Sequence, residues 1–156
     1  MNILAIDPGS LCGFASSLKH GINGIIESGV IDFSLKRGES RGMRYVRFRA
    51  WLKEIIDLTK PDLIIYEMAH HRGGFATEVM IGMTTRIMET CEEMGVEYTS
   101  IHSATLKKFA IGKGKALKEQ MLLLARKKWG DLIEDDNEAD ARWMLEWACK
   151  EYGKLK

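Results

Sequence analysis

Residues 1–10 read MNILAIDPGS, and this stretch decides the class of fold. Asn2–Ile6 is a mostly apolar run, which is typical of a strand buried on both faces of a sheet. Asp7 ends the run, and the proline and glycine after it favour a turn. A second buried run, Leu63–Tyr66, is followed in the same way by Glu67. The sequence therefore predicts two buried strands that each end in a carboxylate.

The rest of the chain shows further strand and helix patterns. Turn residues at 20–21 and 23–24 indicate strands that follow the first one closely. Pro61 and Gly95 are typical of residues that end helices. The predicted strands cover 13–17, 22–31 and 96–101, and the predicted helices cover 40–60, 75–94, a short segment from 103 or 105, 116–129 and a last segment from 135 or 136.

This order of elements predicts one α/β domain over residues 1–156. Short turns make the first three strands antiparallel, whereas crossover helices place the fourth and fifth strands parallel to the first. We therefore expect a five-stranded mixed sheet that is flanked by helices. The carboxyl ends of the first and fourth strands then open on the same edge, where α/β sheets usually bind ligands.

The composition excludes several classes of protein. Hydrophobic residues make up 46% and charged residues 29%, which excludes a disordered or collagen-like chain. No apolar run approaches the roughly 18 residues of a membrane span, and the start lacks the basic segment of a signal peptide. The three cysteines are far apart and fit a reducing compartment. We expect a cytoplasmic protein with no membrane partner.

The charges are unevenly distributed although the net charge is only +1. Residues 36–53 contain seven Lys or Arg against one acid, and residues 107–128 contain eight against one. Six of the ten residues in 131–140 are acidic. This separation favours a surface for an anionic polymer beside a cation site. The alternative is that the basic stretches are ordinary solvated helix faces.

Four carboxylates are expected to meet at the edge of the sheet. Asp7 and Glu67 end the two central strands, while Asp136 and Asp140 are four residues apart and share a face of the last helix. Converging carboxylates repel each other unless a cation binds, and oxygen ligands suit Mg²⁺ or Mn²⁺. Each acid alone has an ordinary alternative: a turn, a strand end or, for Asp136, a helix cap. Their joint occurrence favours a metal site.

Four motifs, in this order, resemble those of one nuclease family. They are ILAIDPGSLCGFA at 3–15, PDLIIYE at 61–67, TLKKFAIGKGKALKEQM at 105–121 and DDNEADARWMLEWA at 135–148. With them the chain resembles the RuvC-type Holliday junction resolvases of the RNase H-like (retroviral-integrase-like) superfamily. Its short form is similar to phage-encoded members. The resemblance implies an RNase H-like fold.

The resemblance also implies a set of metal ligands. Three of the family's four metal-binding acids are matched by Asp7, Glu67 and Asp140. The fourth position holds Asn137, so that Asp136 or Glu138 could serve instead, and we prefer Asp136. The family's chemistry implies two Mg²⁺ ions per site, with Mn²⁺ as a substitute, and hydrolysis that leaves 5′-phosphate and 3′-hydroxyl ends.

The basic motif supplies candidate phosphate contacts. Lys107 and Lys118 match the lysines that flank the family's G-x-G, and a lysine beside the scissile phosphate can stabilise its developing charge. Gly112 and Gly114 permit close approach of a phosphate, although a plain loop between helices is the alternative. The other predicted phosphate contacts are Lys108, Lys113 and Lys115.

The loop after Glu67 is the last candidate site. Family members place an aromatic residue there, which wedges into the centre of the junction. In this chain the loop and the residues after it contain His70, His71, Arg72 and Phe75. His70, His71 or Phe75 could stack on an unpaired base. The alternatives for the two histidines are metal binding and plain loop polarity.

Together these motifs predict a Mg²⁺-dependent endonuclease that resolves four-way (Holliday) junctions by paired cuts. The resemblance implies a homodimer with two active sites, acting in a bacterial or phage-infected cell. One alternative is a less selective nuclease for flaps and branched DNA, and another is an RNase H. An alternative of a different class is a junction-binding protein whose catalytic site has decayed.

Overall fold

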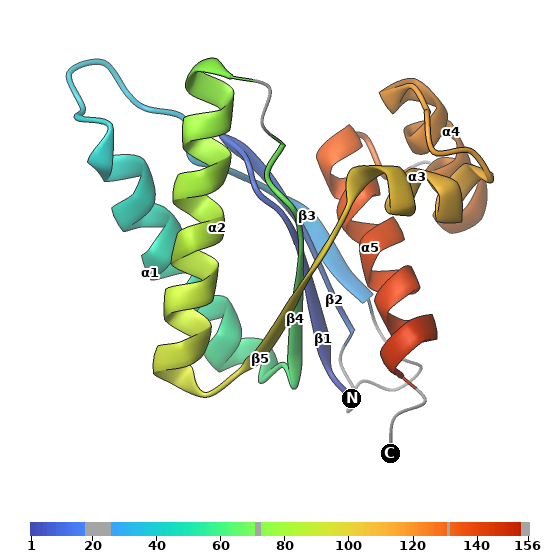
Figure 1. The fold of residues 1–156 in the computed structure, drawn as a ribbon, viewed down its shortest axis with the longest axis horizontal. Helices are drawn as coiled ribbons and strands as arrows, with labels where there is room; N and C mark the ends of the chain where they lie inside the picture. The colour runs from blue at the N-terminus through green and yellow to red at the C-terminus, as the bar shows by residue number, and fades with distance from the viewer. Residues whose placement is uncertain (18–25, 71–72, 131, 154–156) are drawn as a thin grey trace.

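Five strands form one mixed sheet in the order β3-β2-β1-β4-β5 (Figure 1). The computed structural model describes residues 1–17, 26–70, 73–130 and 132–153. β1 pairs antiparallel with β2, and β2 with β3, while β4 lies parallel to both β1 and β5. The predicted arrangement of strands is therefore confirmed. The strands are Ile3–Asp7 (β1), Leu11–Ser17 (β2), Ile26–Asp32 (β3), Leu63–Glu67 (β4) and Glu97–Ile101 (β5).

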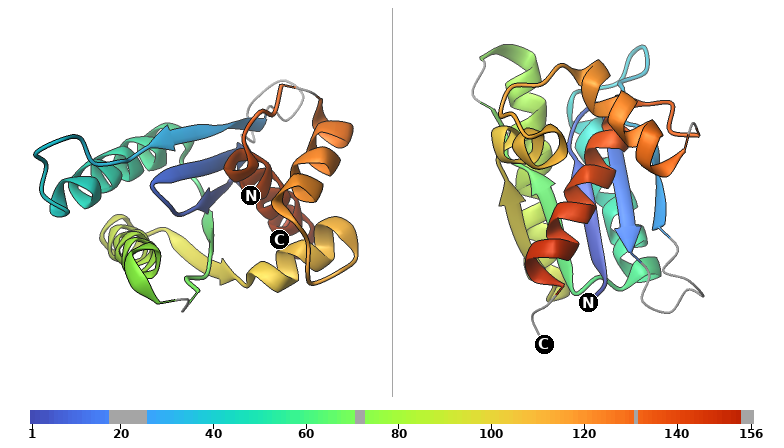
Figure 2. Two further views of the ribbon diagram at one scale, coloured as in Figure 1. Left: turned by 90° about the horizontal axis from the view of Figure 1, so that it is seen from above. Right: turned by 90° about the vertical axis from the view of Figure 1, so that its right-hand side faces the viewer.

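Helices cover both faces of this sheet. The left view of Figure 2 shows the first two helices on one side and the last three on the other. None of the helices in the described ranges is long and apolar enough to span a bilayer. The helices are Gly42–Thr59 (α1), Gly74–Met94 (α2), Ser103–Ile111 (α3), Lys118–Trp129 (α4) and Asp136–Tyr152 (α5).

β1 is apolar from Ile3 to Ile6, before it ends in Asp7, because both faces of the strand are buried. Ile3 and Ala5 belong to the cluster under α3, α4 and α5. Leu4 and Ile6 belong to the second cluster, under α1 and α2. All four side chains have no exposed surface. Successive side chains of the strand thus point into two different cores, which explains why residues 3–6 include no polar side chain.

The boundaries differ from the predictions by a few residues, for local reasons. β2 begins at Leu11, two residues early, because Leu11 already pairs with Asp32 of β3. α4 begins at Lys118, because the N–H of Leu117 donates to the side chain of Gln120 and starts the helix there. The predicted turn residues at 20–21 and 23–24, and the first residues of the predicted strand 22–31, lie outside the described residues.

Gly13 of β2 brings the start of α5 close to the sheet. A β-carbon at this position would lie only 2.0 Å from the carbonyl oxygen of Asn137. Gly13 is also the residue that pairs with Asp7 across β1 and β2. The first turn of α5 therefore lies beside the end of β1, and the right view of Figure 2 shows the helix running along this face of the sheet.

Candidate active site

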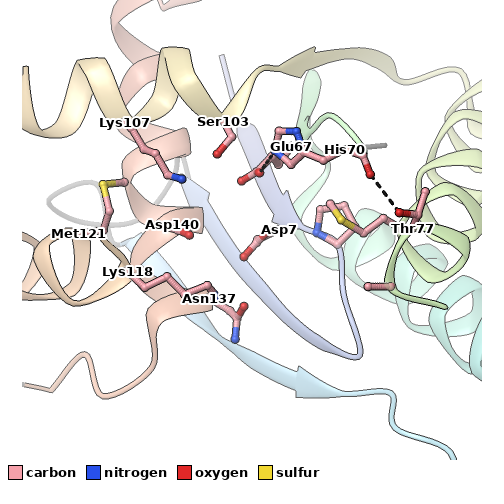
Figure 3. A pocket seen from close by; sticks show the side chains of 13 residues that line it. Asp7, Glu67, His70, Thr77, Ser103, Lys107, Lys118, Met121, Asn137 and Asp140 are labelled. Carbon is pink, nitrogen blue, oxygen red and sulfur yellow. Dashed lines mark hydrogen bonds and ion pairs between the residues drawn. The ribbon is translucent and has the colours of Figure 1, made fainter. Parts of the chain in front are cut away.

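A pocket of about 250 Å³ opens at the carboxyl ends of β1 and β4 (Figure 3). The acids Asp7 and Glu67 reach it from the two strand ends, as the topology of parallel strands predicts. Asp140 reaches it from the second turn of α5. The other lining residues are Pro8, His70, Ala76, Thr77, Met80, Ser103, Lys107, Lys118, Met121 and Asn137.

Asp7 lies among like charges in this pocket. Burial raises the pKa of Asp7 well above its usual range, and the charges of Glu67 and Asp140 raise it further. The charge of Lys118 acts in the opposite direction but does not cancel these effects. The pocket therefore favours a bound cation, which would allow Asp7 to ionise.

Asp140 also has a raised pKa, and one of its carboxylate oxygens lacks a hydrogen bond from the described residues. Burial, followed by the charge of Glu67, raises the pKa of Asp140 to about 7. Its Oδ1 atom is buried and makes no hydrogen bond to any of the residues that the structure describes. A buried carboxylate oxygen without a partner is costly unless a cation or a donor contacts it.

These residues fit a hard divalent cation. Within residues 1–17, 26–70, 73–130 and 132–153, no three His, Cys, Asp or Glu side chains stand close enough to hold one ion by themselves. Mg²⁺ does not require such a cage, because it keeps several waters and usually takes one or two carboxylates plus phosphate oxygens. The carboxylates around the pocket, with the free Oδ1 of Asp140, match that requirement.

The first turn of α5 holds the three candidates for a fourth ligand. Glu138 faces away from the pocket toward β3, where Ser28 donates to its carboxylate at 2.5 Å. Asp136 accepts a hydrogen bond from Lys118 at 2.6 Å. Asn137 lines the pocket, and its side-chain nitrogen Nδ2 donates to Oδ1 of the helix cap Asp135 at 2.8 Å. Figure 3 shows the amide oxygen of Asn137 on the side of Asp7.

Two lysines border the acidic pocket. Lys107 comes from α3 and Lys118 from α4, as Figure 3 shows. The hydrogen bond with Asp136 raises the pKa of Lys118, so this lysine stays charged. The side chains of Ser103, Thr77, Met80 and Met121 also line the pocket and were not predicted from the sequence. Figure 3 shows Asp140 between the two lysines, so the pocket holds carboxylates and ammonium groups close together.

The sequence is similar to those of known crossover junction endodeoxyribonucleases. No protein-family model matches the chain. The crossover junction endodeoxyribonuclease RuvC of Chlamydia muridarum is 27% identical over 145 residues, which cover 89% of this chain and 85% of that protein. RuvC from Chlamydia trachomatis is also 27% identical over 145 residues. The chain is homologous to RuvC.

Solved structures show the same fold. The Thermus thermophilus RuvC structure matches with a TM-score of 0.69 and 20% identity, over 92% of this chain and 90% of that one. The same protein in complex with a Holliday junction substrate matches with a TM-score of 0.71. The Fowlpox virus resolvase in complex with Holliday junction DNA matches with a TM-score of 0.59 at 12% identity, over 93% of this chain and 97% of that one. The RNase H-like fold expected from the motifs is thereby confirmed.

The G-x-G of this RuvC homologue lies outside the pocket, between α3 and α4. Gly112 ends α3 with a φ of +77°, a conformation that favours glycine, and its N–H donates to the carbonyl of Lys108. Gly114 follows in the same loop. The exposed lysines of this region are Lys108, Lys113 and Lys115. Their predicted role as phosphate contacts stays a prediction.

The residues predicted to contact the branch point lie in different environments. His70 lines the pocket and contacts Glu67. Phe75, in the first turn of α2, does not line the pocket. Its half-exposed ring lies 5.4 Å and 5.3 Å from the guanidinium carbons of Arg41 and Arg44. His71 and Arg72 lie outside the described residues.

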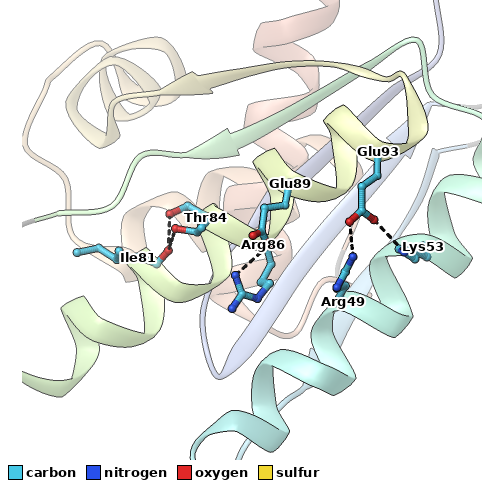
Figure 4. A network of polar contacts seen from close by, with 8 residues as sticks. Arg49, Lys53, Ile81, Thr84, Arg86, Glu89 and Glu93 are labelled. Atoms are coloured by element: carbon cyan, nitrogen blue, oxygen red, sulfur yellow. Dashed lines mark hydrogen bonds and ion pairs between the residues drawn. The ribbon is translucent and has the colours of Figure 1, made fainter.

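The basic stretch at 36–53 is largely paired within the fold. Arg49 and Lys53 of α1 both bind Glu93 of α2, at 2.5 and 3.0 Å (Figure 4). Arg41 pairs with Glu78, and Arg47 pairs with Glu39. Buried Arg44 donates to the carbonyl oxygen of Phe33. These contacts favour the alternative in which this stretch balances charge and joins α1 to α2.

Proposed function

We propose that this protein is a divalent-metal-dependent endonuclease that cuts four-way and related branched DNA. The observation that carries the proposal is the pocket itself. Three acids from two central strand ends and α5 converge there, and one of them has a buried oxygen without a hydrogen-bond partner among the described residues. The homology to RuvC supports the choice of junction DNA as the substrate.

The metal is proposed to be Mg²⁺, two ions per site, with Mn²⁺ as a substitute. Such a pair of ions supplies an activated water and stabilises the leaving 3′ oxygen. Asp7, Glu67 and Asp140 are the residues that would hold them. For the remaining ligand we keep Asp136, with Asn137 as the alternative that lines the pocket. The products are 5′-phosphate and 3′-hydroxyl ends.

The chain's own residues also hold the substrate. Lys107 and Lys118 line the pocket on either side of Asp140, where they can pair with the oxygens of a phosphodiester. An ammonium group there stabilises the additional negative charge that develops during hydrolysis. Outside the pocket, the loop between α3 and α4 would follow the DNA backbone without reading its sequence. The lysines and glycines proposed for this are Lys108, Lys113, Lys115, Gly112 and Gly114.

Paired cutting requires two active sites, so we propose a homodimer. A two-fold dimer presents its sites to two symmetric strands of a junction. We also propose that residues near the end of β4, including Phe75, contact the branch point. The half-exposed ring of Phe75 offers an apolar surface for an unpaired base. The site of action is the cytoplasm of a bacterial or phage-infected cell.

A comparison of substrates tests the proposal. Purified protein with Mg²⁺ should nick a four-way junction faster than a Y-fork, a linear duplex or an RNA–DNA hybrid. Equal rates on forks, flaps and junctions would instead indicate a less selective branched-DNA nuclease. Preference for the hybrid would indicate an RNase H. Junction binding without cutting by the wild type would indicate the decayed binding protein, an alternative that the intact acid pocket disfavours.

A further inference from the structure

His70 contacts the carboxylate of Glu67 at the edge of the pocket. Nε2 of His70 lies 2.9 Å from Oε1 of Glu67 (Figure 3). An ionised carboxylate can only accept hydrogen bonds, so the ring nitrogen is the donor. The side chains are only 23% and 11% exposed, so water competes little for this contact. Hydrogen bonds of this kind, between a donor and a charged acceptor, are stronger than neutral ones.

The surroundings hold His70 in this position. The N–H of Met68 donates to the carbonyl of Ile101, which continues the pairing of β4 and β5 beyond Glu67. The hydroxyl of Thr77 donates to the carbonyl of His70 and ties the loop to α2. The ring of His102 lies 5.5 Å from the ring of His70, at an interplanar angle of 70°. His70 is therefore fixed through its backbone and its ring.

Glu67 needs such a partner more than the two aspartates do. Its side chain has one more rotatable bond, and its charge acts repulsively on both Asp7 and Asp140. Without a second contact, this repulsion would favour rotamers that carry the carboxylate away from the other acids. The hydrogen bond to His70 occupies one of its two oxygens and leaves the other for the pocket.

We infer that His70 is a positioning residue, whose Nε2–H holds Glu67 in the orientation that binds metal. This inference rests on the proposed metal-dependent nuclease and deepens it. Partners that hydrogen-bond a metal ligand commonly change metal affinity, because they fix the orientation of that ligand. Stacking on an unpaired base was one of the roles that the sequence left open for His70, and it requires the ring, whereas positioning of Glu67 requires the N–H donor.

A matched pair of variants separates these roles. His70→Phe keeps an aromatic ring against His102 but removes the donor. His70→Gln removes the ring but keeps an N–H donor at about the distance of Nε2. A positioning role requires the donor, so His70→Gln should behave like the wild type. A stacking role requires the ring, so in that case His70→Phe should behave like the wild type.

The first measurement is calorimetric titration of each variant with Mn²⁺ in the absence of DNA. We expect His70→Phe to weaken binding about 10–100-fold, which is the usual effect of removing a partner of a metal ligand. His70→Gln should stay close to the wild type. The second measurement is the Mg²⁺ concentration for half-maximal nicking of a four-way junction, which should rise by a similar factor for His70→Phe alone. Thermal melts in EDTA show whether both variants fold.

Several outcomes would overturn the inference. It fails if both variants bind Mn²⁺ like the wild type, or if His70→Gln loses affinity and His70→Phe keeps it. It also fails if both folded variants lose affinity equally, because the amide donor should restore it. If the wild type itself neither binds Mn²⁺ nor cuts DNA, the proposed function is wrong, and the inference falls with it.

Discussion

Gly13 and Asn137 touch through their backbones, and this contact places α5 over the end of β1. A β-carbon on Gly13 would lie 2.0 Å from the carbonyl oxygen of Asn137 and 2.4 Å from its carbonyl carbon. Neither atom belongs to a flexible side chain, so the helix would have to move. Because Asn137 and Asp140 lie on this helix, the contact controls how α5 meets Asp7.

Gly13→Ala should therefore reduce stability and metal binding together. Overpacking of a close contact typically costs roughly 1–3 kcal/mol of unfolding free energy. Displacement of α5 would also separate Asp140 from Asp7 and weaken Mn²⁺ binding. Thermal melts and Mn²⁺ titrations check both effects. Gly42→Ala is the matched control, because the nearest described atom outside the local helix backbone, Oγ of Ser40, would lie 4.0 Å from a β-carbon there. Equal behaviour of the two variants would contradict this account of Gly13.

Three alanine variants in the first turn of α5 should rank the candidates for the fourth ligand. Asp136→Ala should raise the Mg²⁺ concentration needed for nicking, and Asn137→Ala should have a smaller effect because an amide brings no charge. Glu138→Ala should leave it unchanged, since this side chain binds Ser28 and pairs with Arg142 at 3.7 Å. Nicking assays over a Mg²⁺ series check the ranking. A large effect at Glu138 alone would contradict it.

The metal-free protein should become less stable as the pH rises. Burial raises the pKa of Asp140 to about 7 in the folded state, whereas its ordinary value is 3.8. Between these pH values the unfolded chain has lost a proton that the folded chain retains, so the free energy of unfolding falls with increasing pH. Thermal melts in EDTA should show this fall, and Asp140→Asn should reduce it.

Added Mg²⁺ should then stabilise the protein more at about pH 8 than at about pH 5, because the ion binds ionised carboxylates. The measurement is the difference in Tm with and without Mg²⁺ at each pH. A Mg²⁺ effect that is larger at the lower pH would be inconsistent with the carboxylate site.

DNA affinity should depend on the loop between α3 and α4, and should do so without regard to DNA shape. Lys115→Ala should weaken binding to a duplex and to a four-way junction alike. It should also reduce the slope of log K against log salt by about 1, since one phosphate contact is lost. Gel-shift titrations at two or more salt concentrations measure both quantities. Phe75→Ala is the contrasting variant, because it should lower junction cutting while duplex affinity stays nearly unchanged.

Much of the site could be predicted because it depends on short-range patterns. Apolar runs that end at Asp7 and Glu67 define central strands, and topology then brings their ends together. Glu138 is only two residues from Asp140, so helix geometry places the two on different faces of α5, and Glu138 contacts Ser28 in the structure.

Other features depend on contacts between distant segments and could not be predicted. Arg41 pairs with Glu78 and Arg49 with Glu93, at separations of 37 and 44 residues, so the sequence showed a basic stretch but not its partners. The contact of His70 with Glu67 spans only three residues, yet it depends on how the loop is held by β5, α2 and His102.

The most direct test of the account is Asp7→Asn, assayed for binding and cutting of a four-way junction in Mg²⁺. Loss of a central metal ligand should reduce nicking by roughly 1,000-fold or more, since metal ions supply several kcal/mol of transition-state stabilisation. Junction affinity should persist, because lysines elsewhere hold the DNA. Loss of cutting with retained binding is the predicted result. Nicking at a rate near that of the wild type would contradict the metal site at the ends of β1 and β4.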